Sequence, residues 1–153
     1  PVKGRANHHS FSESIMTRHP DWERRLARAL ADHAAREAGW GRSDCWTVAC
    51  DVHRAVTGKA LLPYLRRYSS ETGGYRLFRK HGFETVEDAL ASALERRPVL
   101  TAQRGDIGTI ERNGVVACCI FTALGAQVRS APGSPGPWDY YPVTAARAAF
   151  RVG

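Results

Sequence analysis

The 153-residue sequence has no apolar run near the roughly 20 residues that cross a bilayer, so it predicts no membrane span. Its first residues are polar and have no apolar core of the secretory type, so we expect no signal peptide and synthesis in the cytosol. It contains no clustered Lys/Arg run and no nucleic-acid-binding signature. Because 19 of the 22 basic residues are arginines spread along the chain, we interpret the net charge of +7 as compositional and do not expect nucleic acid as a partner.

The four cysteines include no Cys-x-x-Cys pair, a spacing typical of many metal and redox sites. Cys118 and Cys119 are adjacent in a predicted strand, so their side chains point to opposite faces and do not bind one metal together. We therefore expect no metal and no cofactor, and two of the cysteines are expected to pack as small core residues. A structural disulfide and a redox or cluster-binding role of the cysteines are the alternatives.

The most informative segment is Trp40–Trp46, which contains Cys45. Ser43 and Asp44 are favourable N-cap residues, and the apolar residues that follow them recur at helical spacing until Gly58. Cys45 is therefore predicted to lie in the first turn of a helix. Free N–H groups and the positive end of the helix dipole favour thiolate at such a position, which makes Cys45 a candidate nucleophile.

The order of the predicted elements, helices first and then antiparallel strands, indicates an α+β fold. Periodicity and capping residues predict helices over residues 20–38, 45–57, 70–80 and 85–97. Apolar, β-branched runs on either side of the turn Asn113-Gly114 predict a hairpin of strands 107–111 and 115–121, with further strands near 127–130 and 148–152. The stretch 131–142 is rich in Pro, Gly and aromatic residues, and we expect it to be a loop.

The first 15 residues differ in character from the rest of the chain. Residues 1–15 are polar and lack a core-forming pattern, whereas all predicted elements fall within residues 16–153. We therefore expect an N-terminal arm over 1–15 and a single domain over 16–153. Since the arm has little apolar surface of its own to bury, we interpret it as a contact surface for a partner.

Several short motifs within residues 16–153 resemble those of NlpC-type papain-like cell-wall peptidases. The resemblance is closest to a small group of that superfamily that is encoded among phage and prophage tail genes. The motifs are Asp21-Trp22-Glu23, Trp40-Gly41 with Asp44-Cys45, Gly73-Gly74-Tyr75 to Phe78, Arg104-Gly105-Asp106 and the ending Arg151-Val152-Gly153. The resemblance implies a papain-like α+β fold in which N-terminal helices pack on a small antiparallel sheet.

The resemblance also implies a catalytic arrangement that this chain only partly carries. Cys45 matches the nucleophile, but the position of the histidine base falls at or next to Val115, and no histidine stands there. The third, orienting position falls at Gln127 or Ser130 by spacing. Within the Cys45 helix, His53 lies eight residues away, about 12 Å along the axis, and does not reach the thiol.

The missing histidine predicts an inactive domain, and the resemblance implies a component of a phage tail or tail tip that resides in the virion tail after assembly in the host cytoplasm. Other tail proteins are the expected partners, through the arm 1–15 and the aromatic loop 131–142, and peptidoglycan is a further candidate. The candidate binding residues are Trp40, Trp46, Trp138 and Tyr140; Trp46 stands where such peptidases usually have a small residue. The main alternative is an active cysteine hydrolase that cleaves peptidoglycan peptide bonds with Cys45, and a module that binds an anionic polymer is a further one.

Overall fold

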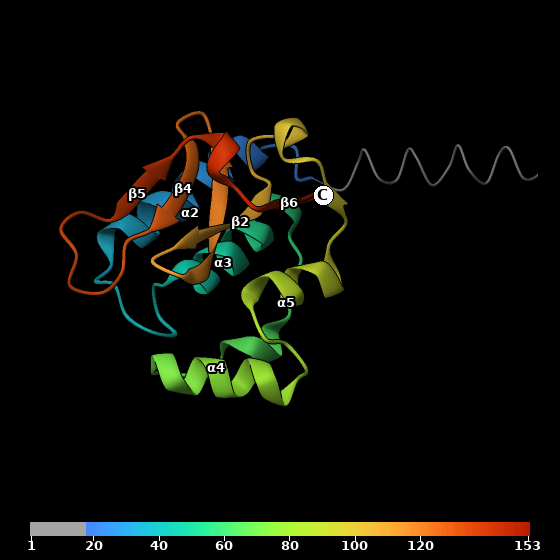
Figure 1. Cartoon of the computed structure of the whole chain (residues 1–153). Coiled ribbons are helices and arrows are strands. Elements are labelled where there is room, and N and C mark those ends of the chain that lie inside the picture. The colour runs from blue at the N-terminus through green and yellow to red at the C-terminus, as the bar shows by residue number, and fades with distance from the viewer. Residues whose placement is uncertain (1–17) are drawn as a thin grey trace, which may run out of the picture.

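The computed structural model describes residues 18–153, and over this range it contains four α-helices and a six-stranded antiparallel sheet (Figure 1). The predicted α+β class is confirmed. The helices are α2 (Trp22–Ala35), α3 (Cys45–Thr57), α4 (Glu71–Lys80) and α5 (Val86–Ala93). The strands are β1 (Arg96–Arg97), β2 (Ile107–Arg112), β3 (Val115–Thr122), β4 (Gly125–Arg129), β5 (Trp138–Tyr141) and β6 (Ala148–Phe150). The arm expected over residues 1–15 lies outside the described residues.

The sheet has the strand order β1-β6-β2-β3-β4-β5, so β2 to β5 form a meander and β6 returns to the other side of β2. The predicted hairpin is confirmed: β2 and β3 pair from Ile107↔Ile120 to Arg112↔Val115 and close at Asn113-Gly114. Both turn residues have positive φ, 53° and 78°, the backbone that a two-residue hairpin turn requires. This topology places β3 in the interior of the sheet.

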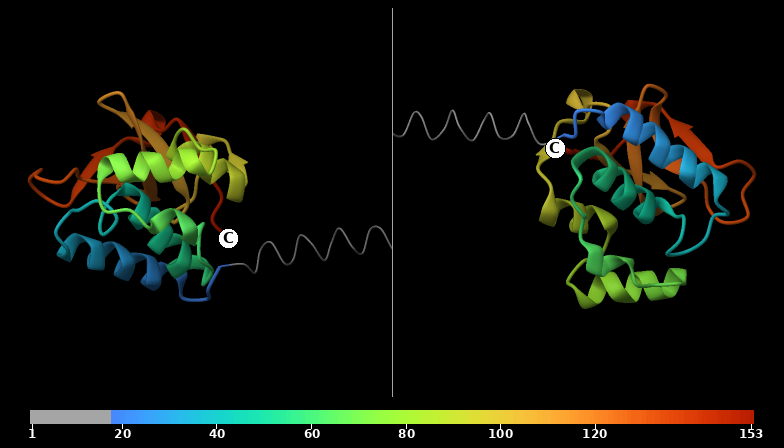
Figure 2. Two further views of the ribbon diagram at one scale, coloured as in Figure 1. Left: turned by 90° about the horizontal axis from the view of Figure 1, so that it is seen from below. Right: turned by 180° about the vertical axis from the view of Figure 1, so that it is seen from behind.

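Strand β3 divides the core into two layers because its side chains alternate between the faces. Cys118 and Ile120 face a large cluster built with α3, whereas Cys119 and Phe121 face a smaller cluster on the opposite side. The predicted separation of Cys118 and Cys119 is confirmed. Helices α2 and α3 lie next to each other against the first face, as Figure 2 shows from behind, and short 3₁₀ segments at Val99–Thr101 and Val143–Ala145 cover the second.

The Arg104–Asp106 turn fastens both ends of the described chain to the sheet. The Asp106 carboxylate is fully buried and accepts four hydrogen bonds. Arg18 Nη2 (3.1 Å) and the Val152 amide (3.0 Å) donate to Oδ1, and Arg97 Nη1 (3.1 Å) and the Gln103 amide (2.9 Å) donate to Oδ2. The two guanidinium groups and two amides compensate the cost of burying the charge.

Several element boundaries differ from the expectation. The predicted loop 131–142 is wrong in its second half, because Trp138–Tyr141 forms β5 and pairs with β4. Aromatic residues favour strands, and the edge of β4 has backbone groups available for pairing. These two factors favour a strand here in spite of the Pro and Gly residues that precede it. The first helix ends at Ala35 rather than near residue 38, and the fourth ends at Ala93, after which Arg96–Arg97 form β1. Within residues 18–153, no helix has the length and apolar content needed to span a membrane.

Candidate functional site

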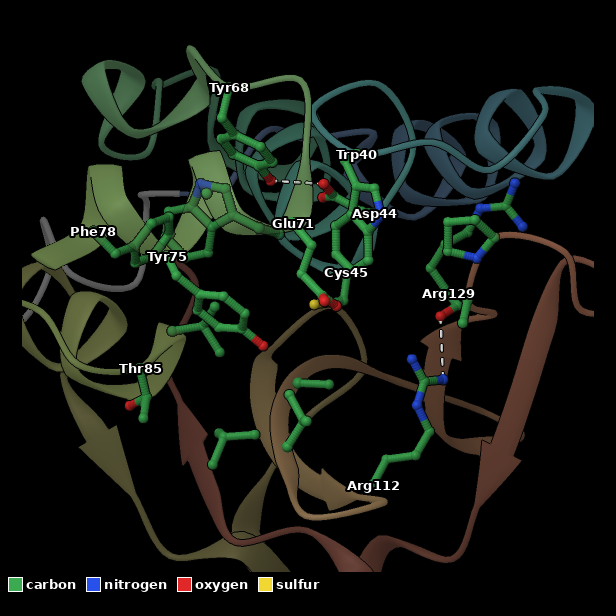
Figure 3. A pocket seen from close by; sticks show the side chains of 18 of the residues that line it. Trp40, Asp44, Cys45, Tyr68, Glu71, Tyr75, Phe78, Thr85, Arg112 and Arg129 are labelled. Atoms are coloured by element: carbon green, nitrogen blue, oxygen red, sulfur yellow. Dashed lines mark hydrogen bonds between the residues drawn. The ribbon is translucent and has the colours of Figure 1, made fainter.

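Cys45 is the first residue of α3, as its N-cap sequence predicted. Asp44 and Thr47 form a capping box in which the Thr47 amide donates to Asp44 Oδ1 (2.8 Å) and the Asp44 amide donates to Thr47 Oγ1 (2.9 Å). The second carboxylate oxygen of Asp44 accepts from the Gly41 amide (2.8 Å) and from the Tyr68 hydroxyl (2.7 Å; Figure 3). These contacts fix the start of the helix and, with it, the position of the Cys45 thiol.

The partly exposed Cys45 side chain lines a pocket of about 310 Å³ between the helices and the sheet (Figure 3). Aromatic rings form much of the helical side of the pocket, and β3 and the ends of β2 and β4 form the other side. The lining residues that matter for the chemistry are Trp40, Asp44, Trp46, Tyr68, Glu71, Tyr75, Phe78, Arg112, Val115, Val116, Ala117, Arg129 and Ser130. The pocket is large enough for a small molecule or a short peptide segment.

Cys45 packs against the cluster that contains Cys118, on β3, and the Cys118 thiol donates a hydrogen bond to the Cys45 sulfur. This hydrogen bond lowers the pKa of Cys45, with a smaller contribution from the Arg112 charge, and outweighs the opposing effects of burial and of Asp44. Burial raises the pKa of Cys118 well above its ordinary value, and the Cys45 thiolate raises it further. The pair therefore holds its first negative charge on Cys45.

The histidines among residues 18–153 all lie away from the pocket lining. His33 is buried against Ser43 and Asp51, as expected of a packing residue. His53 Nδ1 lies 2.9 Å from the Lys59 carbonyl oxygen. The His81 ring packs at a tilt against the Tyr64 ring, and His19 lies beside Asp21 before α2.

The alternation of side chains along β3 shows which strand positions lie on the same face as Cys118. Because Cys118 faces α3, the next residue on the same face toward the start of the strand is Val116, not Val115. Val116 is partly buried and Val115 is 46% exposed, and both belong to the pocket lining. The β3 residues that line the pocket are therefore aliphatic (Val115, Val116 and Ala117), with Cys118 in the core cluster behind them, and none of these side chains is a general base.

The other predicted site residues separate into two groups. Trp40, Trp46 and Ser130 line the pocket, and Trp46 is also a core residue that packs edge-on against Phe78 with ring centroids 5.1 Å apart. The other three do not line the pocket: Gln127 is buried and accepts a hydrogen bond from Thr122, Trp138 stacks on the Arg129 guanidinium, and Tyr140 is half exposed on β5. The Trp46 indole N–H is buried without an acceptor in the described part of the chain.

A buried polar network next to the pocket had no signal in the sequence. His33 Nδ1 lies 2.8 Å from Ser43 Oγ, and His33 Nε2 lies 2.6 Å from Asp51 Oδ2, an order that resembles a Ser-His-Asp triad. Ser43 is fully buried, however, and its oxygen accepts a hydrogen bond from Arg129 Nε (2.9 Å). No substrate reaches this hydroxyl, so the network holds α2, α3 and β4 together.

Arg129 and Asp51 are the charged ends of this network. Arg129 also donates to the carbonyl oxygens of Arg36 (2.8 Å) and Pro137 (2.7 Å), which ties the loop after α2 to the β4–β5 connection. Although burial opposes the shift, hydrogen bonds from His33 and Arg66 lower the pKa of Asp51 to about 2. The part of the chain that the structure describes contains no group of three or more His, Cys, Asp or Glu side chains arranged to hold a metal ion.

Comparison with known proteins adds one assignment to this geometry. No curated protein and no solved structure matches the chain. Residues 17–152, which include the Cys45 pocket, the Asp106 turn and the whole sheet, match one family model. The chain therefore belongs to the family described as a domain of unknown function (DUF6950).

Proposed function

We propose that this chain is a structural component of a phage tail or tail tip, built on a degenerate papain-like domain whose pocket binds rather than cuts. The observation that carries the proposal is the immediate surroundings of Cys45. The thiol lies at the start of a helix packed on an antiparallel sheet, but the strand in front of it presents Val116 and the Cys118 thiol. Neither side chain acts as the general base that cysteine proteolysis requires.

The pocket has features that suit a docking recess for a partner segment. Three large hydrophobic residues of its lining remain exposed: Trp40 (37%), Tyr75 (41%) and Val115 (46%). Aromatic side chains are enriched at protein interfaces because they bury a large area with few rotatable bonds. In this proposal the partner is another tail protein or a peptidoglycan peptide, and the arm 1–15, the loop before β5 and Tyr140 on β5 extend the contact.

The alternative is a working cysteine hydrolase, and one observation favours it. The Cys118 hydrogen bond lowers the pKa of Cys45, which favours the nucleophilic thiolate relative to an ordinary cysteine. A thiolate in a pocket of this size can attack an electrophile, but the leaving amine of a peptide still needs a proton donor. Glu71 and Tyr75 are the titratable pocket residues of α4 that would have to supply the proton.

The experiment that tests the proposal compares the wild-type chain with Cys45→Ala in two assays. Purified chain is incubated with peptidoglycan and with isolated cross-linked peptides, and soluble products are identified by mass spectrometry. In parallel, particles are purified from cells in which the gene is deleted or replaced by either version. We expect no released product, the chain present in tailed particles, loss of tails on deletion, and normal assembly with Cys45→Ala.

Two results would overturn the proposal. Product release by the wild type but not by Cys45→Ala identifies a cysteine hydrolase instead of a binding domain. Normal tailed particles after deletion, without the chain among their proteins, contradict a structural role in the tail. Ser134→Ala, in the exposed loop outside the pocket, is the matched control for handling and expression.

A further inference from the structure

We infer that Cys45 and Cys118 form a redox-active dithiol that exchanges with small-molecule disulfides through the Cys45 pocket. The inference goes beyond the proposed tail role and does not depend on it. It rests on how two thiols from distant parts of the chain are placed with respect to each other and to solvent.

The two thiols meet where the first turn of α3 packs against the middle of β3. Cys45 is residue one of α3, and Cys118 lies on the face of β3 that packs against that helix. Cys118 belongs to the buried cluster against which Cys45 packs, and the hydrogen bond between the two thiols that lowers the pKa of Cys45 agrees with this placement. A disulfide requires this adjacency of sulfur atoms from backbones that approach closely.

The two thiols differ in access in the way that a redox pair requires. Cys45 is partly exposed and lines the pocket, whereas Cys118 is 2% exposed and does not line it. An external reagent therefore meets only Cys45. Helix N-terminal placement favours the Cys45 thiolate as the attacking group, and the buried Cys118 is positioned to resolve the product.

The remaining cysteines are excluded from this chemistry by their positions, because a raised pKa is a property that they share with Cys118. Cys50 is buried within α3, its thiol donates to the Leu61 carbonyl oxygen (3.6 Å), and burial raises its pKa to about 12. Cys119 is fully buried on the opposite face of β3, and burial raises its pKa to about 12 as well. Only the Cys45–Cys118 pair combines an accessible thiol with an adjacent buried one.

The reaction balances with an external disulfide as the oxidant. The Cys45 thiolate attacks one sulfur of a small disulfide such as oxidised glutathione, the S–S bond of the reagent breaks, and one glutathione thiolate leaves. The Cys118 thiol then gives its proton to solvent and attacks Cys45 Sγ, which expels the second glutathione thiolate. The protein dithiol loses two electrons, one disulfide forms, and the reagent is reduced to two thiols.

The oxidised state has a direct consequence for the pocket. The disulfide links α3 covalently to β3 and removes the only thiolate from the lining. Any chemistry or adduct formation at Cys45 is switched off in this state and restored by reduction. The volume of about 310 Å³ admits a small disulfide but excludes a folded protein, which is why the expected reagent is of low molecular weight.

The test uses the reduced full-length chain in glutathione buffers of increasing oxidised-to-reduced ratio at pH 7. Free thiols are counted after unfolding, and disulfide-linked peptides are mapped by mass spectrometry without reduction. We expect the count to fall from four to two with one linked peptide pair, Cys45–Cys118. Cys118→Ala is expected to stop at a mixed disulfide, with one glutathione on Cys45 and no internal link.

Cys119→Ala is the matched control, because it removes a buried thiol from the adjacent position of β3 on the opposite face. It is expected to form the Cys45–Cys118 disulfide at the same glutathione ratio as the wild type. The inference is overturned if all four wild-type thiols survive a large excess of oxidised glutathione. It is equally overturned if the mapped link contains Cys50 or Cys119, or if the wild type retains glutathione on Cys45 without resolving it. None of these readouts depends on wall hydrolysis or particle assembly.

Discussion

Replacement of Asp106 by asparagine should be among the most destabilising single substitutions in this domain. The carboxylate is fully buried and accepts from Arg18 and the Val152 amide on one oxygen, and from Arg97 and the Gln103 amide on the other. Asparagine has almost the same volume, so the change tests charge and hydrogen bonding rather than packing. The NH₂ group of asparagine replaces one carboxylate oxygen. Because NH₂ is itself a donor, the two groups that donated to that oxygen lose their acceptor.

The magnitude follows from the loss of the buried charge. Breaking a buried ion pair by neutralising one partner costs about 3–5 kcal/mol, because the other charge remains desolvated. Here two guanidinium groups, Arg18 and Arg97, lose the carboxylate together. For a domain of this size, about 2–4 °C is lost per kcal/mol, so the melting temperature should fall by roughly 10 °C.

The measurement is urea unfolding followed by tryptophan fluorescence, with thermal unfolding as a second readout. Asp21→Asn is the matched control, because the Asp21 carboxylate is 42% exposed and pairs with Arg25 at the surface. Its unfolding midpoint should stay close to that of the wild type. A loss of less than about 1 kcal/mol for Asp106→Asn would refute the interpretation of Asp106 as a buried charge hub.

Three further predictions follow from the same contacts. In the native chain, iodoacetamide should label Cys45 first, with a pH midpoint below the ordinary value near about 8.5, because the pKa of Cys45 is lowered; a midpoint above that value contradicts this. Gly108→Ala should lose about 1–3 kcal/mol in urea unfolding, since its Cβ would lie 2.5 Å from the Phe121 ring and 2.6 Å from the Ala148 carbonyl oxygen. The pKa of Asp51 is lowered to about 2, so its contribution to stability is fully present above about pH 5 and is lost as the pH falls toward 2; Asp51→Asn should flatten this part of the stability curve, and an unchanged curve would contradict the assignment.

Local sequence signals predicted the elements that depend on near neighbours. Asp44 and Thr47 lie three residues apart and cap α3 together, so the position of Cys45 could be derived from a few consecutive residues. The Asn113-Gly114 turn likewise predicted the β2–β3 hairpin. In both cases the backbone conformation that the residues favour on their own is the one that the fold uses.

Predictions failed where a distant partner decided the outcome. The segment Trp138–Tyr141 became a strand because the edge of β4 was available to pair with it, which composition alone did not indicate. Spacing left the position of the base at or next to Val115, and Val115 and Val116 both line the pocket in the structure. A shift of one residue moves a strand side chain to the other face, so approximate spacing is not sufficient there.

The sequence by itself determined that Cys45 opens a helix, because capping depends on residues within one turn. It also determined that no histidine stands at the start of β3. Only the tertiary structure decided which side chains contact the Cys45 thiol. Residues 45 and 118 are far apart in the chain, and their contact depends on how α3 packs on the sheet and on the register of β3. That packing turned a candidate nucleophile without a base into one member of a thiol pair.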